Sequence, residues 1–248
     1  MAYLPKVVIE EWDAWAPGLT LKEDWKNWAL NPYSLTQGER IITKNIPPII
    51  KRRCSELSKI FLDLAINVSR NRVIDYSVFC SQHGELDHSI KLLNNICENE
   101  DLSPMTFVQS VHNTSSGLFT IIENIKDSST SIASGPSTFI SGFIEAVSWL
   151  QTNPDKQVLL VMADTLVPRV YSSLVSDTKY PYGLSLLLRL SKKGEAKTIQ
   201  GSILKSKRDT ICKELPVGLE FLQWFLSDKN SLDQAGSSFS IVWEKVVG

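Results

Sequence analysis

The stretch that decides the fold is MTFVQSVHNTSSGLFTIIENIKDSSTSIASGPSTFISGFIEAVSWL, residues 105–150. Apolar residues recur at helical spacing on both sides of a short polar stretch, first at Leu118, Ile121, Ile122 and Ile125, then at Phe139, Ile140, Phe143, Ile144, Val147 and Leu150. This spacing predicts two amphipathic helices, and residues 129–133 between them are typical of a strand. A strand between two such helices favours a layered α/β domain.

The same alternation continues outward from this stretch. Residues 76–80 and 158–162 are apolar runs of the length expected for buried strands. Leu86, Ile90, Leu93 and Cys97 predict one apolar helix face, which makes Cys97 a core residue. Residues 184–190 and 198–204 flank a turn sequence and predict a hairpin. A helix over 219–226 and a strand over 239–243 are expected near the end.

Composition limits the possible classes of function. The chain has 248 residues, 43% hydrophobic and 21% charged, with a net charge of -1, so nothing indicates nucleic acid as a partner. Neither a signal peptide nor an apolar run of the roughly 20 residues that span a membrane is present, so we expect a cytoplasmic protein. The scattered cysteines predict no disulfide scaffold and no zinc site, and no cofactor-binding motif occurs.

Local basic runs remain open to two interpretations. Lys51, Arg52 and Arg53 form one run, and Lys192 and Lys193 form another. Each is typical of a solvated surface, although such a run could also meet an acidic carrier protein.

Several motifs together resemble the first half of a ketoacyl synthase of the thiolase superfamily. Asn113 and Gly117 match the asparagine and glycine before an amphipathic helix, residues 131–133 match the strand before the nucleophile, and Ala146 matches a small residue in the following helix. The resemblance implies a thiolase-like α/β fold with α-β-α layers, truncated to the first half.

The resemblance is closer still to short, chain-length-factor-like subunits of aryl polyene and related type II polyketide systems. Residues 12–18, 81–85 and 110–113 and the terminal strand ending in Trp243 fit that subfamily. It implies one ketosynthase-like domain over residues 1–248. Its parts are a Trp-rich N-terminal extension with helices (1–70), a thiolase-like core (71–204) and a C-terminal capping segment (205–248).

A ketosynthase needs a nucleophilic cysteine and, usually, two histidines. Counting without gaps from Asn113 places the nucleophile position on Pro136, whereas anchoring on Gly142 places it on Ser134. Proline offers neither a nucleophile nor a backbone N–H for an oxyanion. The last histidine in the sequence is His112, which precedes both positions, so the resemblance implies a subunit that is not an enzyme by itself.

An active ketosynthase is therefore the expected partner, and an acyl carrier protein is expected to interact either with this subunit or through that partner. The resemblance places the interface at Ser110, Val111, His112, Asn113, Ser131, Ile132 and Ala133. Phe107, Phe139 and Phe143 are candidates for an acyl tunnel, or else simply core residues. Two alternatives stay open, namely a divergent acyltransferase or hydrolase using Ser134, and a homodimeric module that binds acyl groups or carrier protein.

Overall fold

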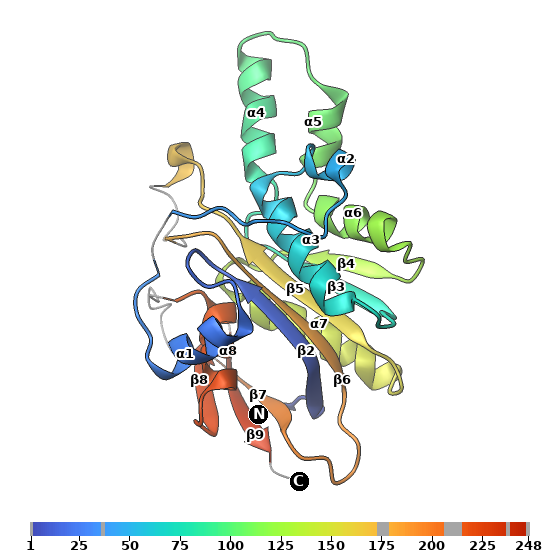
Figure 1. The fold of residues 1–248 in the computed structure, drawn as a ribbon, viewed down its shortest axis with the longest axis vertical. Helices are drawn as coiled ribbons and strands as arrows, with labels where there is room; N and C mark the ends of the chain where they lie inside the picture. The colour runs from blue at the N-terminus through green and yellow to red at the C-terminus, as the bar shows by residue number, and fades with distance from the viewer. Residues whose placement is uncertain (1, 36–37, 173–178, 206–214, 237–238, 247–248) are drawn as a thin grey trace.

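The computed structural model describes residues 2–35, 38–172, 179–205, 215–236 and 239–246. Within these residues a nine-stranded sheet runs in the order β4-β3-β5-β6-β2-β7-β9-β8, with β1 paired to β7 (Figure 1). The strands are β1 (Ala2–Tyr3), β2 (Val7–Trp15), β3 (Tyr76–Cys80), β4 (Ser129–Ile132), β5 (Val158–Asp164), β6 (Tyr182–Leu190), β7 (Thr198–Lys205), β8 (Ser231–Ala235) and β9 (Phe239–Val246). The helices are α1 (Lys22–Leu30), α2 (Pro48–Lys51), α3 (Glu56–Ser69), α4 (Leu86–Cys97), α5 (Pro104–Gln109), α6 (Thr114–Glu123), α7 (Thr138–Thr152) and α8 (Val217–Leu226).

Helices cover both faces of the sheet, as the layered α-β-α expectation required. One core cluster joins the sheet to α7, α8 and α1, and the other joins it to α3 and α6. Along β5, Leu160 enters the first cluster while its neighbours Leu159 and Val161 enter the second. Because successive strand residues point to opposite faces, a strand with both faces covered is apolar throughout. The run at 158–162 was therefore correctly predicted as a strand buried on both faces.

The predicted hairpin between the strands at 184–190 and 198–204 is wrong. Both strands form, but β2 lies between β6 and β7 and pairs antiparallel with β6 from Val7 opposite Leu190 to Trp15 opposite Gly183. The connection between β6 and β7 must then cross two strand spacings of about 4.8 Å each. The turn around Gly194, whose φ is +76°, is part of a wider loop that passes the end of β2.

The C-terminal part of the chain completes the core on the side of α7. Phe221 of α8 and Trp243 of β9 pack against Phe143, with ring centroids 5.8 and 4.6 Å away. The Trp243 Nε1–H donates to Gln234 Oε1 at 2.7 Å, which satisfies a buried indole between β8 and β9. Residues 217–226 and 239–246 thus belong to the main core, and β9 extends the sheet beyond β7.

Close packing of α7 on β3 generates the first prediction. A Cβ at Gly142 would lie 2.1 Å from Cys80 Sγ, so Gly142→Ala should lower the free energy of unfolding by about 2 kcal/mol or more. The matched control is Gly117→Ala in α6, where nothing lies within 4 Å of the added Cβ. Alanine there should stabilise the helix by about 0.5–1 kcal/mol. Urea unfolding of both variants measures the contrast, and equal effects would contradict this packing.

Candidate subunit interface

The carboxyl ends of the parallel strands β3, β4 and β5 meet at one edge of the sheet. Ser81, just after β3, donates its backbone N–H to Ile132 O at 3.2 Å. Its hydroxyl donates to Asp164 Oδ1 at 2.7 Å, and the Gln82 N–H donates to the same oxygen at 2.9 Å. These bonds fix the chain that leaves β3 against the end of β5.

Asp164 is a buried acid at this edge. Burial raises its pKa to about 6, although the hydrogen bonds from Ser81 and Gln82 act in the opposite direction by stabilising the carboxylate. The Tyr182 hydroxyl also faces it, with 3.5 Å to Asp164 Oδ2. Asp164 therefore holds the strand ends together at some electrostatic cost.

The turn between β4 and α7 carries both candidate nucleophile positions. Gly135 has a φ of +54°, and residues 135–137 form a short 3₁₀ turn with Pro136 exposed. The Ser134 N–H donates to Thr138 Oγ1 at 2.9 Å, and that hydroxyl in turn donates to Gly135 O at 2.7 Å. Thr138 thus ties the turn to the first residue of α7, which leaves the hydroxyl of exposed Ser134 at the surface.

The outer edge of β4 is an open edge within the described sheet, because β3 is its neighbour on one side only. The carbonyl of Ser128 accepts a hydrogen bond from Ser77 of β3, and the carbonyl of Ile132 accepts one from Ser81 just after β3. The N–H and C=O of one residue in a strand point the same way, and successive residues alternate. Ser129 and Ser131 therefore direct their backbone groups outward, where another strand could pair with them.

The segment between α5 and α6 lies against the loop that follows β3 and is held there by His112. Its Nε2 lies 2.9 Å from Ser81 O, and its ring packs on Gly84, where a Cβ would come within 2.6 Å. Val111 and Asn113 on either side are exposed, and Ser110 is half-buried. His112 therefore fixes the loop from inside, and its neighbours face solvent.

Helices α4 and α5 pack on each other and stand beyond one end of the sheet (Figure 1). The two helices form a helical hairpin with strongly exposed apolar side chains. They are Leu93 and Ile96 on α4, Met105, Phe107 and Val108 on α5, Leu102 in the loop between them and Val111 after α5, and we call these residues the hairpin surface. The predicted core position of Cys97 is wrong, because this thiol is exposed near the far end of α4. The apolar periodicity of α4 is real, but the helix extends past the body that would cover it.

Buried polar contacts attach the base of this hairpin to the body. Glu85, directly before α4, accepts hydrogen bonds from Ser55 at 2.9 Å and Ser58 at 2.6 Å. Burial raises the pKa of Glu85 despite these bonds. His88 Nδ1 lies 3.1 Å from Gln109 O and 3.6 Å from Glu85 Oε2, so it links the start of α4 to the end of α5. His83 thus lies in the loop before α4, and His88 lies in the first turn of α4 beside this network.

The three tunnel candidates separate in the structure. Phe139 and Phe143 are each 1% exposed and pack against Phe221. Both are therefore core residues, which was the alternative to a place in the tunnel. Phe107 is 62% exposed on the hairpin surface. Only Phe107 of the three is accessible to a partner in this arrangement.

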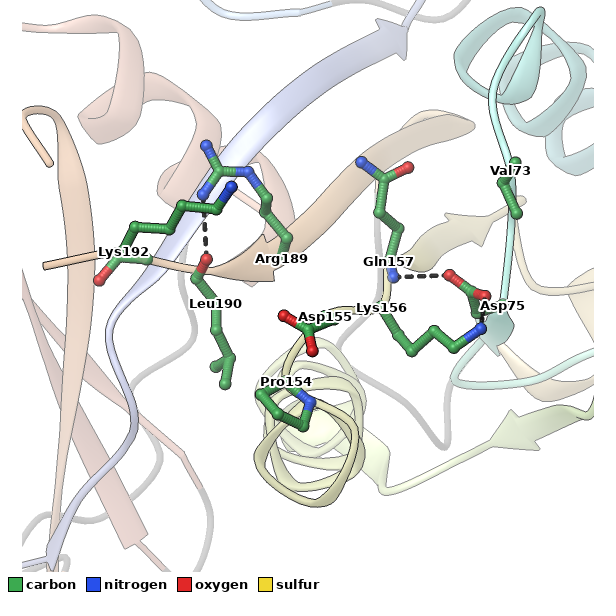
Figure 2. Close-up of a pocket in the computed structure, with 10 residues that line it drawn as sticks. Val73, Asp75, Pro154, Asp155, Lys156, Gln157, Arg189, Leu190 and Lys192 are labelled. Atoms are coloured by element: carbon green, nitrogen blue, oxygen red, sulfur yellow. Dashed lines mark hydrogen bonds and ion pairs between the residues drawn. The ribbon is translucent and has the colours of Figure 1, made fainter.

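A pocket of about 670 Å³ lies at the other end of the sheet, beside the amino ends of β3 and β5 (Figure 2). Three of the charged side chains that line it, Asp75, Lys156 and Arg189, have partners within the chain. Lys156 Nζ lies 2.7 Å from Asp75, and Arg189 donates to Glu195 and pairs with Glu10. These ion pairs connect the lining residues to each other and to Glu10 and Glu195.

The layered fold and the arrangement at the carboxyl ends of β3, β4 and β5 are those of a ketosynthase-like α/β protein. The family model described as beta-ketoacyl synthase, N-terminal domain, matches residues 25–244, so the chain belongs to that family. In a search of curated proteins, none matches. None of the described helices is long and apolar enough to cross a membrane.

Solved structures agree with this assignment. The chain is similar to one in the complex of a ketosynthase (ApeO) with its chain length factor (ApeC) from Xenorhabdus doucetiae. That match has 27% identity, a TM-score of 0.87 and coverage of 97% of this chain and 99% of the other. The ishigamide ketosynthase/chain length factor matches with 13% identity, a TM-score of 0.65, and coverage of 81% and 67%. A beta-ketoacyl synthase from Burkholderia phymatum matches with 12% identity, a TM-score of 0.55, and coverage of 76% and 60%.

The buried acid generates the second prediction. Folded Asp164 titrates near pH 6 and an unfolded aspartate near 4, so the folded state binds more protons between these values. Stability from this group should therefore rise by roughly 3 kcal/mol as the pH falls from 7 to 4, and Asp164→Asn should remove that rise. Urea unfolding across this range measures it, with exposed Asp155→Asn as control. Parallel pH profiles for wild type and Asp164→Asn would contradict the assignment.

Proposed function

We propose that this protein is a non-catalytic, chain-length-factor-like subunit that forms a heterodimer with an active β-ketoacyl synthase. It stabilises that enzyme and helps to shape the tunnel for a growing acyl or polyene chain in aryl polyene or related type II polyketide or fatty-acid-like biosynthesis. The observation that carries the proposal is the combination of an open edge at β4 with the exposed hairpin surface.

The two features complement each other as an interface. An open edge supplies directional hydrogen bonds, which set the register of a partner strand. The hairpin surface supplies the apolar area that a stable interface buries at its centre. Residues 110–113 connect the two features along the chain, since they lead from α5 into α6, which packs against β4.

The likeness to the Xenorhabdus complex supports a ketosynthase as the partner. The matched chain there is covered over 99% of its length, so a chain of this extent occurs within a complex of a ketosynthase and its chain length factor. We propose the same kind of pairing here. The acyl carrier protein would deliver its cargo to the active partner.

The proposed absence of catalysis rests on the turn before α7. The nucleophile position falls on Pro136 or on Ser134, depending on how the residues are counted, and neither is a cysteine. The thiols that the structure describes lie elsewhere. Cys80 is fully buried behind α7, and burial raises its pKa far above the ordinary thiol range, which opposes thiolate formation. His88 and His112 have backbone carbonyls within hydrogen-bond distance, at Gln109 O and Ser81 O.

The pairing of β4 with a partner strand generates a third prediction. Ser131→Pro removes a backbone N–H that points outward, while the bonds between β4 and β3 use the alternate residues. The expected result is a heterodimer about 5-fold to 150-fold weaker, because a lost buried hydrogen bond costs about 1–3 kcal/mol. Co-expression with the cysteine-bearing ketosynthase encoded nearest to this chain, followed by chromatography with light scattering, measures complex formation. Ser131→Ala keeps the N–H and serves as control, and equal complex yields for the two variants would place the interface elsewhere.

The hairpin surface generates a fourth prediction. Val108→Asp should abolish or strongly weaken the heterodimer, because it would bury an unpaired carboxylate in an apolar contact. Val108 is 64% exposed, so the isolated chain should keep its melting temperature and gain solubility. The matched control is Val73→Asp, which changes a valine that is 70% exposed in the loop before β3. If the two variants bind the ketosynthase equally well, the hairpin surface is not part of the interface.

A further inference from the structure

Positive charge is concentrated in one segment of a chain whose total charge is -1. Residues 39–59 carry only two acidic residues but six basic ones, which are Arg40, Lys44, Lys51, Arg52, Arg53 and Lys59. This segment comprises α2, the loop before it and the start of α3. Six basic and two acidic residues give this segment a net charge of +4, so the rest of the chain carries -5, and the segment favours an acidic partner.

Contacts to the body hold this segment in place. The Lys44 N–H donates to Asp63 Oδ1 at 3.1 Å, and Lys51 Nζ donates to Thr43 O at 2.8 Å. The next residues, Arg52 and Arg53, are exposed. The backbone that presents these guanidinium groups is therefore preorganised, which lowers the entropy cost of binding.

Two isoleucine pairs give the segment an apolar component. Ile41 and Ile50 pack against the core cluster under α3. Their neighbours Ile42 and Ile49 are 78% and 73% exposed, so each pair has one member inside and one outside. The surface thus combines fixed cations with protruding aliphatic side chains, and we call Ile42, Ile49, Arg52 and Arg53 the α2 surface.

We propose that the α2 surface docks an acidic protein surface that also exposes apolar side chains, and that this subunit thereby takes part directly in recruiting the carrier protein. The identity of that partner rests on the proposed function, but the charge argument does not. Arginine forks suit carboxylates, and the two isoleucines would pack on aliphatic side chains between them.

The same features disfavour the other polyanions. A nucleic-acid site needs a longer positive stripe to match successive phosphates, and exposed isoleucines offer nothing to phosphate oxygens. Stable membrane association uses a longer amphipathic helix or a lipid anchor, whereas α2 has four residues. A compact site with two cations and two aliphatic side chains has the scale of a small protein contact.

The position of the α2 surface suits such a role. Ser55, two residues after Arg53, donates to Glu85 at the base of the hairpin. A protein docked on α2 would therefore lie next to the proposed ketosynthase interface. Carrier binding and heterodimer formation are nevertheless separable, because Arg52 and Arg53 are outside the residues assigned to that interface.

The test is a matched pair of charge reversals. Arg52→Glu with Arg53→Glu is compared with Lys192→Glu with Lys193→Glu, which reverses two exposed lysines in the loop after β6. The probe is fluorescently labelled apo acyl carrier protein encoded with the ketosynthase, added at low salt to the chain alone and to its complex. The arginine variant should bind about tenfold more weakly and lose most of the salt dependence. Ile49→Ser should weaken binding without changing the salt dependence, and the lysine variant should match the wild type.

Each outcome decides a separate question. Equal binding by the wild type and the arginine variant would overturn the inference, even if light scattering shows an intact heterodimer. Carrier binding that depends on Arg52 and Arg53, in a chain that ignores the ketosynthase, would support the inference while refuting the proposed function. Binding to vesicles of anionic phospholipid, lost in the arginine variant and without any binding of the carrier, would overturn protein docking. Melting temperatures of all variants establish that each is folded.

Discussion

The fold depends on β3, a five-residue strand in which every side chain is buried. Val78 enters the core cluster of α7, its neighbour Phe79 enters that of α3, and parallel strands occupy both sides. A shift of one residue would exchange these faces, so the two layers fix the register together. Gly142 allows α7 to approach Cys80 closely. Because β3 pairs with only one side of β4, the other side of β4 stays open. The strand that organises the core thus also positions the candidate interface.

Elements whose residues all face the core could be predicted from the sequence. The helix α7 and the strand β5 have apolar patterns that follow from burial, and both form where expected. The strand β2 could not be predicted, because Glu10, Glu11 and Asp13 interrupt its apolar residues. Their charges are compensated by residues far away in sequence, since Arg189 pairs with Glu10 and Arg72 with Glu11. Local patterns do not contain such pairs, and so the hairpin of β6 and β7 was expected in place of the true order.

The candidate site shows a different limit of sequence analysis. The helix α4 was predicted with an apolar face, and it has one, yet Leu93 and Cys97 are exposed. Hydrophobic periodicity predicts that a helix face will be buried, but it does not show whether the same chain or another chain buries it. Phe139 and Phe143 illustrate the converse, because a resemblance suggested a tunnel while Phe221 and Trp243, distant in sequence, enclose them.

The exposed hairpin surface has an energetic consequence for the free subunit. Seven large apolar side chains are exposed on and beside these two helices, and large exposed apolar patches on soluble proteins often mark interaction sites. Each side chain of this size gains about 1.5–3 kcal/mol when it is fully buried, so covering several of them can drive a strong association. The polar contacts of Glu85 and His88 hold the base of the hairpin to the body before any partner arrives. A preorganised apolar surface loses little entropy on binding, which favours an obligate subunit over a transient one.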